Sequence, residues 1–241
     1  MNKHLQTVKN TFNKQEYLNN SSYRIYVRKI IIKEMLKKHK ITPQSILDIG
    51  CGDGSLSFQL LNKKSSLTLL DLSPHMIQLC KKTIIKNKIK NTKTILGNYN
   101  KAPKKKYDLI ICIGLLAHVD NISNLLDIIS DRLSKNAILI IETTKNPYPL
   151  KKYFNLYYYL KSFFIKDVNT YSKNHLSEKN LLRQLGSRNF VNISIKKFNI
   201  PLPGMRLWPK VLKNFYTYLT YKSPILSRYG SEAILLCKKN K

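Results

Sequence analysis

The chain has 241 residues, of which 43% are hydrophobic. This length can bury a substantial core, and the composition excludes a wholly disordered protein. No apolar run approaches the roughly 20 residues that a membrane-spanning helix needs, and the first residues contain no signal-peptide apolar block. We therefore expect a cytoplasmic protein that forms a single domain over residues 1–241.

Charge is the unusual property of this sequence. It contains 43 Lys and Arg against 13 Asp and Glu, which gives a formal net charge of +30. Such a surface attracts anions, so nucleic acid and the inner face of an anionic membrane are both candidate partners. The alternative is codon bias, because Lys, Asn and Ile all have AT-rich codons. Only seven of the cations are Arg, the better reader of phosphate, which favours this second interpretation.

Short apolar segments alternate with helical patterns from the N-terminal third to about residue 145. Continuously apolar strands of this kind are typical of a parallel sheet covered on both faces, so we predict an α/β fold. The expected strands are 45–49, 67–71, 92–96, 107–113, 137–142, 191–200 and 233–237. The expected helices are 22–39, 55–62, one opened by Ser73 and Pro74, 121–134, 177–186 and 210–221.

The domain divides into three parts by pattern. Residues 1–40 are expected to form a helical lid and 41–145 a cofactor-binding core. Residues 146–241 would supply the substrate side and the last two strands, with an insertion at 201–230. The four cysteines lie far apart without a CxxC pair, so we predict reduced, mostly buried thiols and no metal site.

The most informative segment is the glycine-rich run that follows the first strand, ILDIGCGDGS at 46–55. Gly50, Gly52 and Gly54 turn the chain from a strand into a helix. Glycine is needed where backbone approaches a ligand closely, and the free N–H groups of the helix suit a carboxylate. Dehydrogenases that bind dinucleotides use a similar turn, so the turn alone does not identify the ligand.

Three residues around this turn separate the possibilities. Asp48 sits at the strand end, where it could neutralise an ammonium group, directly or through water, or could merely cap the glycine turn. Ser55 replaces the third glycine of the dinucleotide pattern G-x-G-x-x-G, which argues against a dehydrogenase. Asp71 closes the next strand, and it is placed to accept hydrogen bonds from both hydroxyls of a ribose.

Four segments together resemble the class I S-adenosylmethionine-dependent methyltransferases. They are LDIGCGDG at 47–54, DLSPHM at 71–76, LGN at 96–98, and the strand 107–113 with LLAHV at 115–119. The resemblance covers about residues 41–145. It implies a Rossmann-like class I methyltransferase fold, a mostly parallel seven-stranded sheet with a C-terminal antiparallel hairpin. The insertion at 201–230 departs from the minimal form of that fold.

The resemblance also implies S-adenosylmethionine as cofactor. Asp48 would then face its ammonium, Asp71 its ribose and Asn98 its adenine amino group, while Met76 packs on the adenine or in its own helix. The residues that we expect to contact the cofactor are Asp48, Gly50, Cys51, Gly52, Gly54, Asp71, Leu72, Met76, Asn98, Tyr99 and Ile113.

Two histidines are candidate catalytic residues. His118 follows the fourth strand, and a neutral imidazole there could serve as general base. The alternative is a structural histidine, which we favour slightly. His175 is the second candidate, and its position before a helix also suits a flanking role.

The acceptor is predicted to be a small molecule or a lipid- or glycan-linked group, methylated at oxygen. Enzymes that methylate base amines carry an [Asp/Asn/Ser]-Pro-Pro-aromatic tetrad after strand four, whereas this chain has GLLAH at 114–118. In this respect it resembles quinone-biosynthesis and glycoconjugate methyltransferases. An RNA methyltransferase and a non-catalytic nucleic-acid-binding protein on the same fold are the alternatives.

Two basic, aromatic segments, 150–165 and 210–221, have apolar residues at helical spacing. They could lie on an anionic bilayer as a peripheral membrane contact, or they could pack on the domain as a cap over the substrate pocket.

Overall fold

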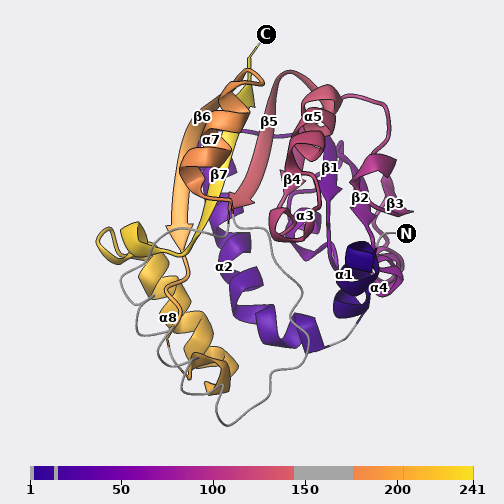
Figure 1. The fold of residues 1–241 in the computed structure, drawn as a ribbon. Helices are drawn as coiled ribbons and strands as arrows, with labels where there is room; N and C mark the ends of the chain where they lie inside the picture. The colour runs from indigo at the N-terminus through magenta and orange to yellow at the C-terminus, as the bar shows by residue number, and fades with distance from the viewer. Residues whose placement is uncertain (1–2, 14–15, 144–175, 203, 241) are drawn as a thin grey trace.

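The computed structural model describes residues 3–13, 16–143, 176–202 and 204–240. In this part of the chain, seven strands form one mixed sheet in the order β3-β2-β1-β4-β5-β7-β6 (Figure 1). The strands are β1 Ser45–Ile49, β2 Ser66–Asp71, β3 Thr92–Leu96, β4 Tyr107–Cys112, β5 Leu133–Thr143, β6 Phe190–Phe198 and β7 Glu232–Lys239. The predicted mostly parallel sheet is confirmed, and β7 runs antiparallel to both β5 and β6.

Helices cover both faces of the sheet, as the apolar strands require. The helices are α1 Lys3–Phe12, α2 Glu16–Lys38, α3 Ser55–Phe58, α4 Pro74–Lys86, α5 Ile122–Arg132, α7 Glu178–Gly186 and α8 Lys210–Lys222. Short 3-10 turns occur at η1 Tyr99–Lys101, η2 Leu116–His118, η3 Met205–Leu207 and η4 Leu226–Tyr229. Figure 1 shows α8 beside α2, below the end of the sheet at which β5 finishes.

The alternation of side chains along β4 explains why there are two cores. Ile110 and Cys112 belong to a cluster that α5 and α7 cover. Leu109 and Ile111 point the other way, into a cluster that α2, α4 and α8 cover. Because all of these strand residues are apolar, β4 is stable only when both faces are buried.

Several element boundaries differ from those predicted. The N-terminal segment contains α1, which the pattern did not reveal, and α2 begins well before residue 22. The helix predicted at 55–62 ends at Phe58. Beyond it, the Leu60 N–H donates to the Ser57 carbonyl, three residues earlier, which is the spacing of a 3-10 turn. The strand predicted at 137–142 begins at Leu133 because Leu133 pairs with Tyr107 before a register shift.

Two predictions lie outside the described residues: the aromatic segment 150–165 and the candidate catalytic residue His175. Among the residues that are described, none of the helices combines the length and the apolar character that crossing a bilayer requires. All four cysteines are buried, as predicted.

Candidate active site

The glycine turn brings backbone to the surface of a cavity at the carboxyl end of β1. Gly50 and Gly52 have φ angles of +75° and +55°, in the left-handed region that favours glycine. The Gly50 N–H donates to the Leu70 carbonyl at 2.8 Å, which fastens the turn to β2. A Cβ atom on Gly52 would meet nothing within 4 Å, so the backbone there is open to a ligand.

Asp71, at the end of β2, is held in place by two backbone donors. The Gly52 N–H donates to Oδ2 and the Ser73 N–H donates to Oδ1, each at 2.8 Å. Burial raises the pKa of Asp71 above its usual value, and these N–H groups counteract part of the increase. Each carboxylate oxygen keeps capacity for a further hydrogen bond, which suits a pair of neighbouring hydroxyls.

The cavity gathers most of the predicted cofactor residues. Its wall includes Gly50, Cys51, Gly52, Asp71, Leu72, Met76, Asn98, Tyr99, Ile113 and His118. The β3 end is tied to the β2 end because the Gly97 N–H donates to the Asp71 carbonyl at 2.8 Å. Parallel strands therefore bring residues that are distant in sequence to one crevice at their carboxyl ends.

Two predicted residues lie behind this wall. Asp48 is buried under the glycine turn and accepts a short hydrogen bond from the Ser57 hydroxyl. Burial raises the pKa of Asp48 to about 7, while the bond from Ser57 acts in the opposite direction. Gly54 precedes α3 and does not belong to the cavity lining. Their contacts with a cofactor remain predictions.

The N-terminal helix α1 supplies part of the cavity wall. Val8 and Phe12 lie on that wall, and the Phe12 ring meets the His118 ring edge-on with centroids 4.9 Å apart. The Ser73 hydroxyl donates to Asn13 Oδ1 at 2.7 Å and fixes the end of this segment against α4. His118 is therefore part of the joint between α1 and η2.

Two residues of the site were not predicted from the sequence: Arg28, which lines the cavity, and Glu142, which pairs with it. Arg28 on α2 lines the cavity, and its Nε donates to Glu142 Oε1 at 2.8 Å. Its Nη2 donates to Glu232 Oε2 at 3.3 Å. Glu232 also accepts from Arg24 and from Asn199, at 3.2 Å and 2.8 Å. The result is a buried ionic network that links α2 to β5 and β7.

Glu142 closes an apolar strand and is completely buried, and within the part of the chain that the structure describes its Oε2 has no hydrogen-bond partner. Burial raises its pKa to about 7, although Arg28 acts to lower it. Gly114 lies between this carboxyl and the cavity: a Cβ there would be 3.8 Å from Glu142 Oε2 and from Arg28 Nη1. The signal that identified Asp71, a carboxylate at the end of an apolar strand, was equally present at Glu142.

The described residues contain no group of three or more His, Cys, Asp or Glu side chains arranged to hold a metal ion. The charged groups of the site are thus carboxylates and a guanidinium around an otherwise apolar cavity. This arrangement can hold a ligand with hydroxyl groups and separate charges.

Comparisons with known proteins place this geometry in context. A family described as a methyltransferase domain matches residues 43–192. A ubiquinone biosynthesis O-methyltransferase of Rickettsia typhi is 27% identical over 215 residues, which is 84% of this chain and 83% of that protein. A protein of the same name from Pelagibacter ubique is 31% identical over 121 residues, 49% of this chain and 50% of its own length.

A malonyl-[acyl-carrier protein] O-methyltransferase of Ilyobacter polytropus is 32% identical over 150 residues, 60% of this chain and 54% of that protein. The chain thus spans about half the length of two of these three relatives. Among solved structures, magnesium protoporphyrin IX methyltransferase from Synechocystis with bound S-adenosylhomocysteine is similar, with a TM-score of 0.67 at 12% identity. That match covers 98% of this chain and 100% of the other. At this identity the likeness shows a shared fold.

Proposed function

Because this chain belongs to the class I S-adenosylmethionine-dependent methyltransferases, we propose that it methylates an oxygen of a small-molecule, lipid-linked or glycan-linked acceptor. The observation that carries the proposal is the cavity in which Asp71 and the glycine turn share a wall with Arg28. A nucleoside joined to an amino acid needs three things in one cavity: an acceptor for the ribose hydroxyls, backbone that is not covered by side chains, and charges opposite to its carboxylate and ammonium groups.

The residues of the cavity fit such a donor. Asp71 keeps one hydrogen-bonding position on each oxygen for a ribose hydroxyl, and Asn98 would accept from the adenine amino group. Among the described residues of the wall, Arg28 carries a permanent positive charge and would pair with the carboxylate. Asp48 would balance the ammonium through the glycine turn. When bound, the donor supplies a methyl group on a sulfonium that is already activated.

The chain then has to align the acceptor and exclude water. Val8 and Phe12 of α1 add apolar side chains to the cavity wall, and α1 would act as the lid. A hydroxyl acceptor must also lose a proton, and His118 is a wall residue whose imidazole could take it. We assign His118 the structural role instead, because its ring packs against Phe12.

Methylation at oxygen is supported by the relatives. The proteins from Rickettsia typhi, Pelagibacter ubique and Ilyobacter polytropus are all named as O-methyltransferases, the first two of ubiquinone biosynthesis and the third of malonyl-[acyl-carrier protein]. The net charge of +30 supports a second candidate, an RNA methyltransferase or a non-catalytic RNA-binding protein. RNA retention that is steeply salt-sensitive, without donor binding, would favour the non-catalytic form.

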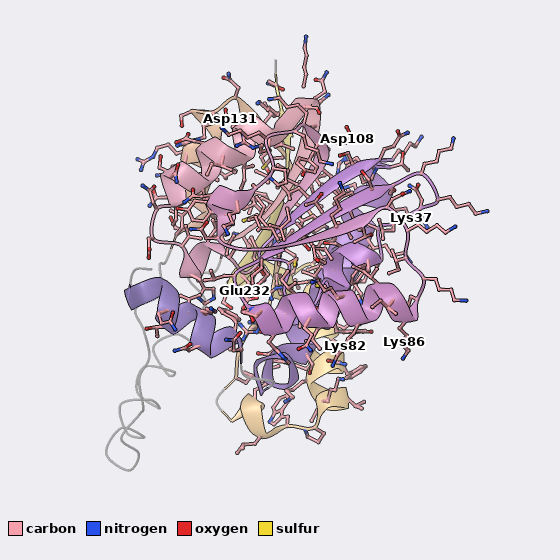
Figure 2. All side chains as sticks on the ribbon, turned by 90° about the vertical axis from the view of Figure 1, so that its right-hand side faces the viewer. Lys37, Lys82, Lys86, Asp108, Asp131 and Glu232 are labelled. Atoms are coloured by element: carbon pink, nitrogen blue, oxygen red, sulfur yellow. The ribbon has the colours of Figure 1, made fainter. Side chains whose placement is uncertain are left out.

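Calorimetry with S-adenosylhomocysteine tests the donor site. Asp71→Ala should weaken binding by about 10- to 100-fold, since hydrogen bonds to a charged group are worth about 1.5–3 kcal/mol. Asp131→Ala is the matched control, because Asp131 is exposed at the far end of α5 (Figure 2). Unchanged affinity in Asp71→Ala would refute the ribose assignment. Incubation of labelled donor with lipid, RNA and metabolite extracts then shows which fraction takes up the methyl group.

A further inference from the structure

The helix α8 is inverted with respect to the usual pattern of a surface helix. Its buried side carries Thr217, Thr220 and Tyr221. Several of its large apolar side chains face solvent: Val211 is 81% exposed, Phe215 58% and Leu219 46%. Residues at this spacing lie on one side of a helix, so they form a continuous apolar stripe.

Two further apolar side chains are exposed in the segments that flank the helix. Leu207 of η3 is 89% exposed, and Ile225, just before η4, is 69% exposed. We call the exposed side chains Leu207, Val211, Leu212, Phe215, Leu219 and Ile225 the α8 outer face. Scattered apolar residues are common on a protein surface, whereas a stripe of this kind marks a place where something binds.

Hydrogen bonds to neighbouring elements fix the rotation of α8 about its own axis. The Tyr221 hydroxyl and Lys222 Nζ each donate to a carboxylate oxygen of Glu34 on α2, both at 2.6 Å. The Tyr216 hydroxyl donates to the Ile200 carbonyl at 3.0 Å. Turning the apolar stripe inward would break all three bonds and expose the buried Tyr221 to solvent.

Charge identifies the partner of this face. Residues 201–231 contain five Lys and Arg and no Asp or Glu. Lys210 and Arg228 are exposed near the two ends of the stripe. A second copy of the chain would bring a further net charge of +30 against this surface, which disfavours self-association.

We propose that the α8 outer face docks on an anionic lipid bilayer. The apolar stripe enters the boundary between headgroups and acyl chains, while Lys210 and Arg228 meet lipid phosphates. Since α8 is fastened to α2, and α2 carries the cavity residues Ile25 and Arg28, docking would hold the cavity in a fixed orientation to the lipid surface. The docking does not depend on the methyl-transfer proposal, because donor affinity can be measured without vesicles.

Vesicle co-sedimentation tests the proposal with the full chain. Phosphatidylcholine vesicles with phosphatidylglycerol should retain the protein at low salt, and pure phosphatidylcholine vesicles should not. Val211→Ser with Phe215→Ser should reduce the partition coefficient by about tenfold or more. The matched control is Ile85→Ser with Val191→Ser, which removes exposed apolar side chains elsewhere and should bind as the wild type does.

Charge reversal separates a local contact from the overall field. Lys210→Glu with Arg228→Glu should reduce retention by about tenfold or more, whereas Lys82→Glu with Lys86→Glu on α4 should have a much smaller effect (Figure 2). Equal losses in the two pairs would overturn the proposal, as would equal binding to neutral vesicles.

Concentration-dependent dimers that disappear in the serine variant would show that a second copy covers the face instead. Donor affinity should be unchanged in all four variants, so failure here leaves the donor site intact.

Discussion

The helix α2 joins two regions of the molecule that are built in opposite ways. At the cavity it buries Arg28 against Glu142 and Glu232, among strands that are otherwise apolar. Closer to its C-terminal end, Glu34 pairs at the surface with α8, whose apolar side chains face solvent. The first region hides charge and the second exposes apolar surface. The first arrangement suits a small charged ligand, and the second suits an extended partner.

The largest difference between these regions should appear in stability. Arg28→Met leaves two buried glutamates without their shared partner, and the loss of one member of a buried pair costs about 3–5 kcal/mol. Lys222→Met breaks an ion pair with Glu34 in which both side chains are partly exposed, so the cost should be below about 1 kcal/mol. Urea denaturation of both variants measures the contrast. Equal losses would mean that α2 does not divide the molecule as described.

A smaller effect should appear in the pH dependence of donor binding. Asp48 has a pKa raised by burial to about 7, so it holds a proton below that pH and cannot balance an ammonium group. Affinity for S-adenosylhomocysteine should therefore rise by about tenfold per pH unit below pH 7 and level off above it. Calorimetry across this range measures the slope, which Asp48→Asn should abolish. A slope that persists in this variant would assign the titration to Asp71 or Glu142, two other carboxyl groups of the site whose pKa values burial also raises.

Local backbone rules explain which parts of the site could be predicted. Gly50 and Gly52 need positive φ angles, and Asp71 ends an apolar strand beside them, so the sequence alone was enough to predict that these residues lie together. The pairing of Arg28 with Glu142 spans 114 positions, and no local pattern connects them. These two charges come together only in the folded chain, where α2 and β5 contribute to the same hydrophobic cluster. The spacing of residues in the sequence can predict a site that forms within one turn. It cannot predict an ionic network between elements that are distant in the sequence, because that network forms only when the chain folds.

The helix α8 shows a second limit of prediction from the sequence. Its bounds were predicted to within one residue, because helical periodicity is a local property. Periodicity shows that a helix has an apolar face and does not say what covers that face. Both a membrane contact and a cap packed on the domain were compatible with the pattern. The structure turns Val211 and Phe215 outward because Thr217, Thr220 and Tyr221 occupy the inner side.

The smallest expected effect concerns the contact between α1 and the core. His118→Ala removes an edge-on contact with Phe12, and aromatic pairs are worth about 0.5–1.5 kcal/mol, so donor affinity should fall by about 2- to 10-fold. The pH profile of turnover should keep its shape. His118→Phe retains an aromatic ring without a titratable group, and it should restore most of the affinity. The contrary result is a loss of about 100-fold in kcat in both variants, together with the loss of one limb of the pH profile. It would show that His118 takes the acceptor's proton, because the phenyl ring of His118→Phe cannot accept a proton.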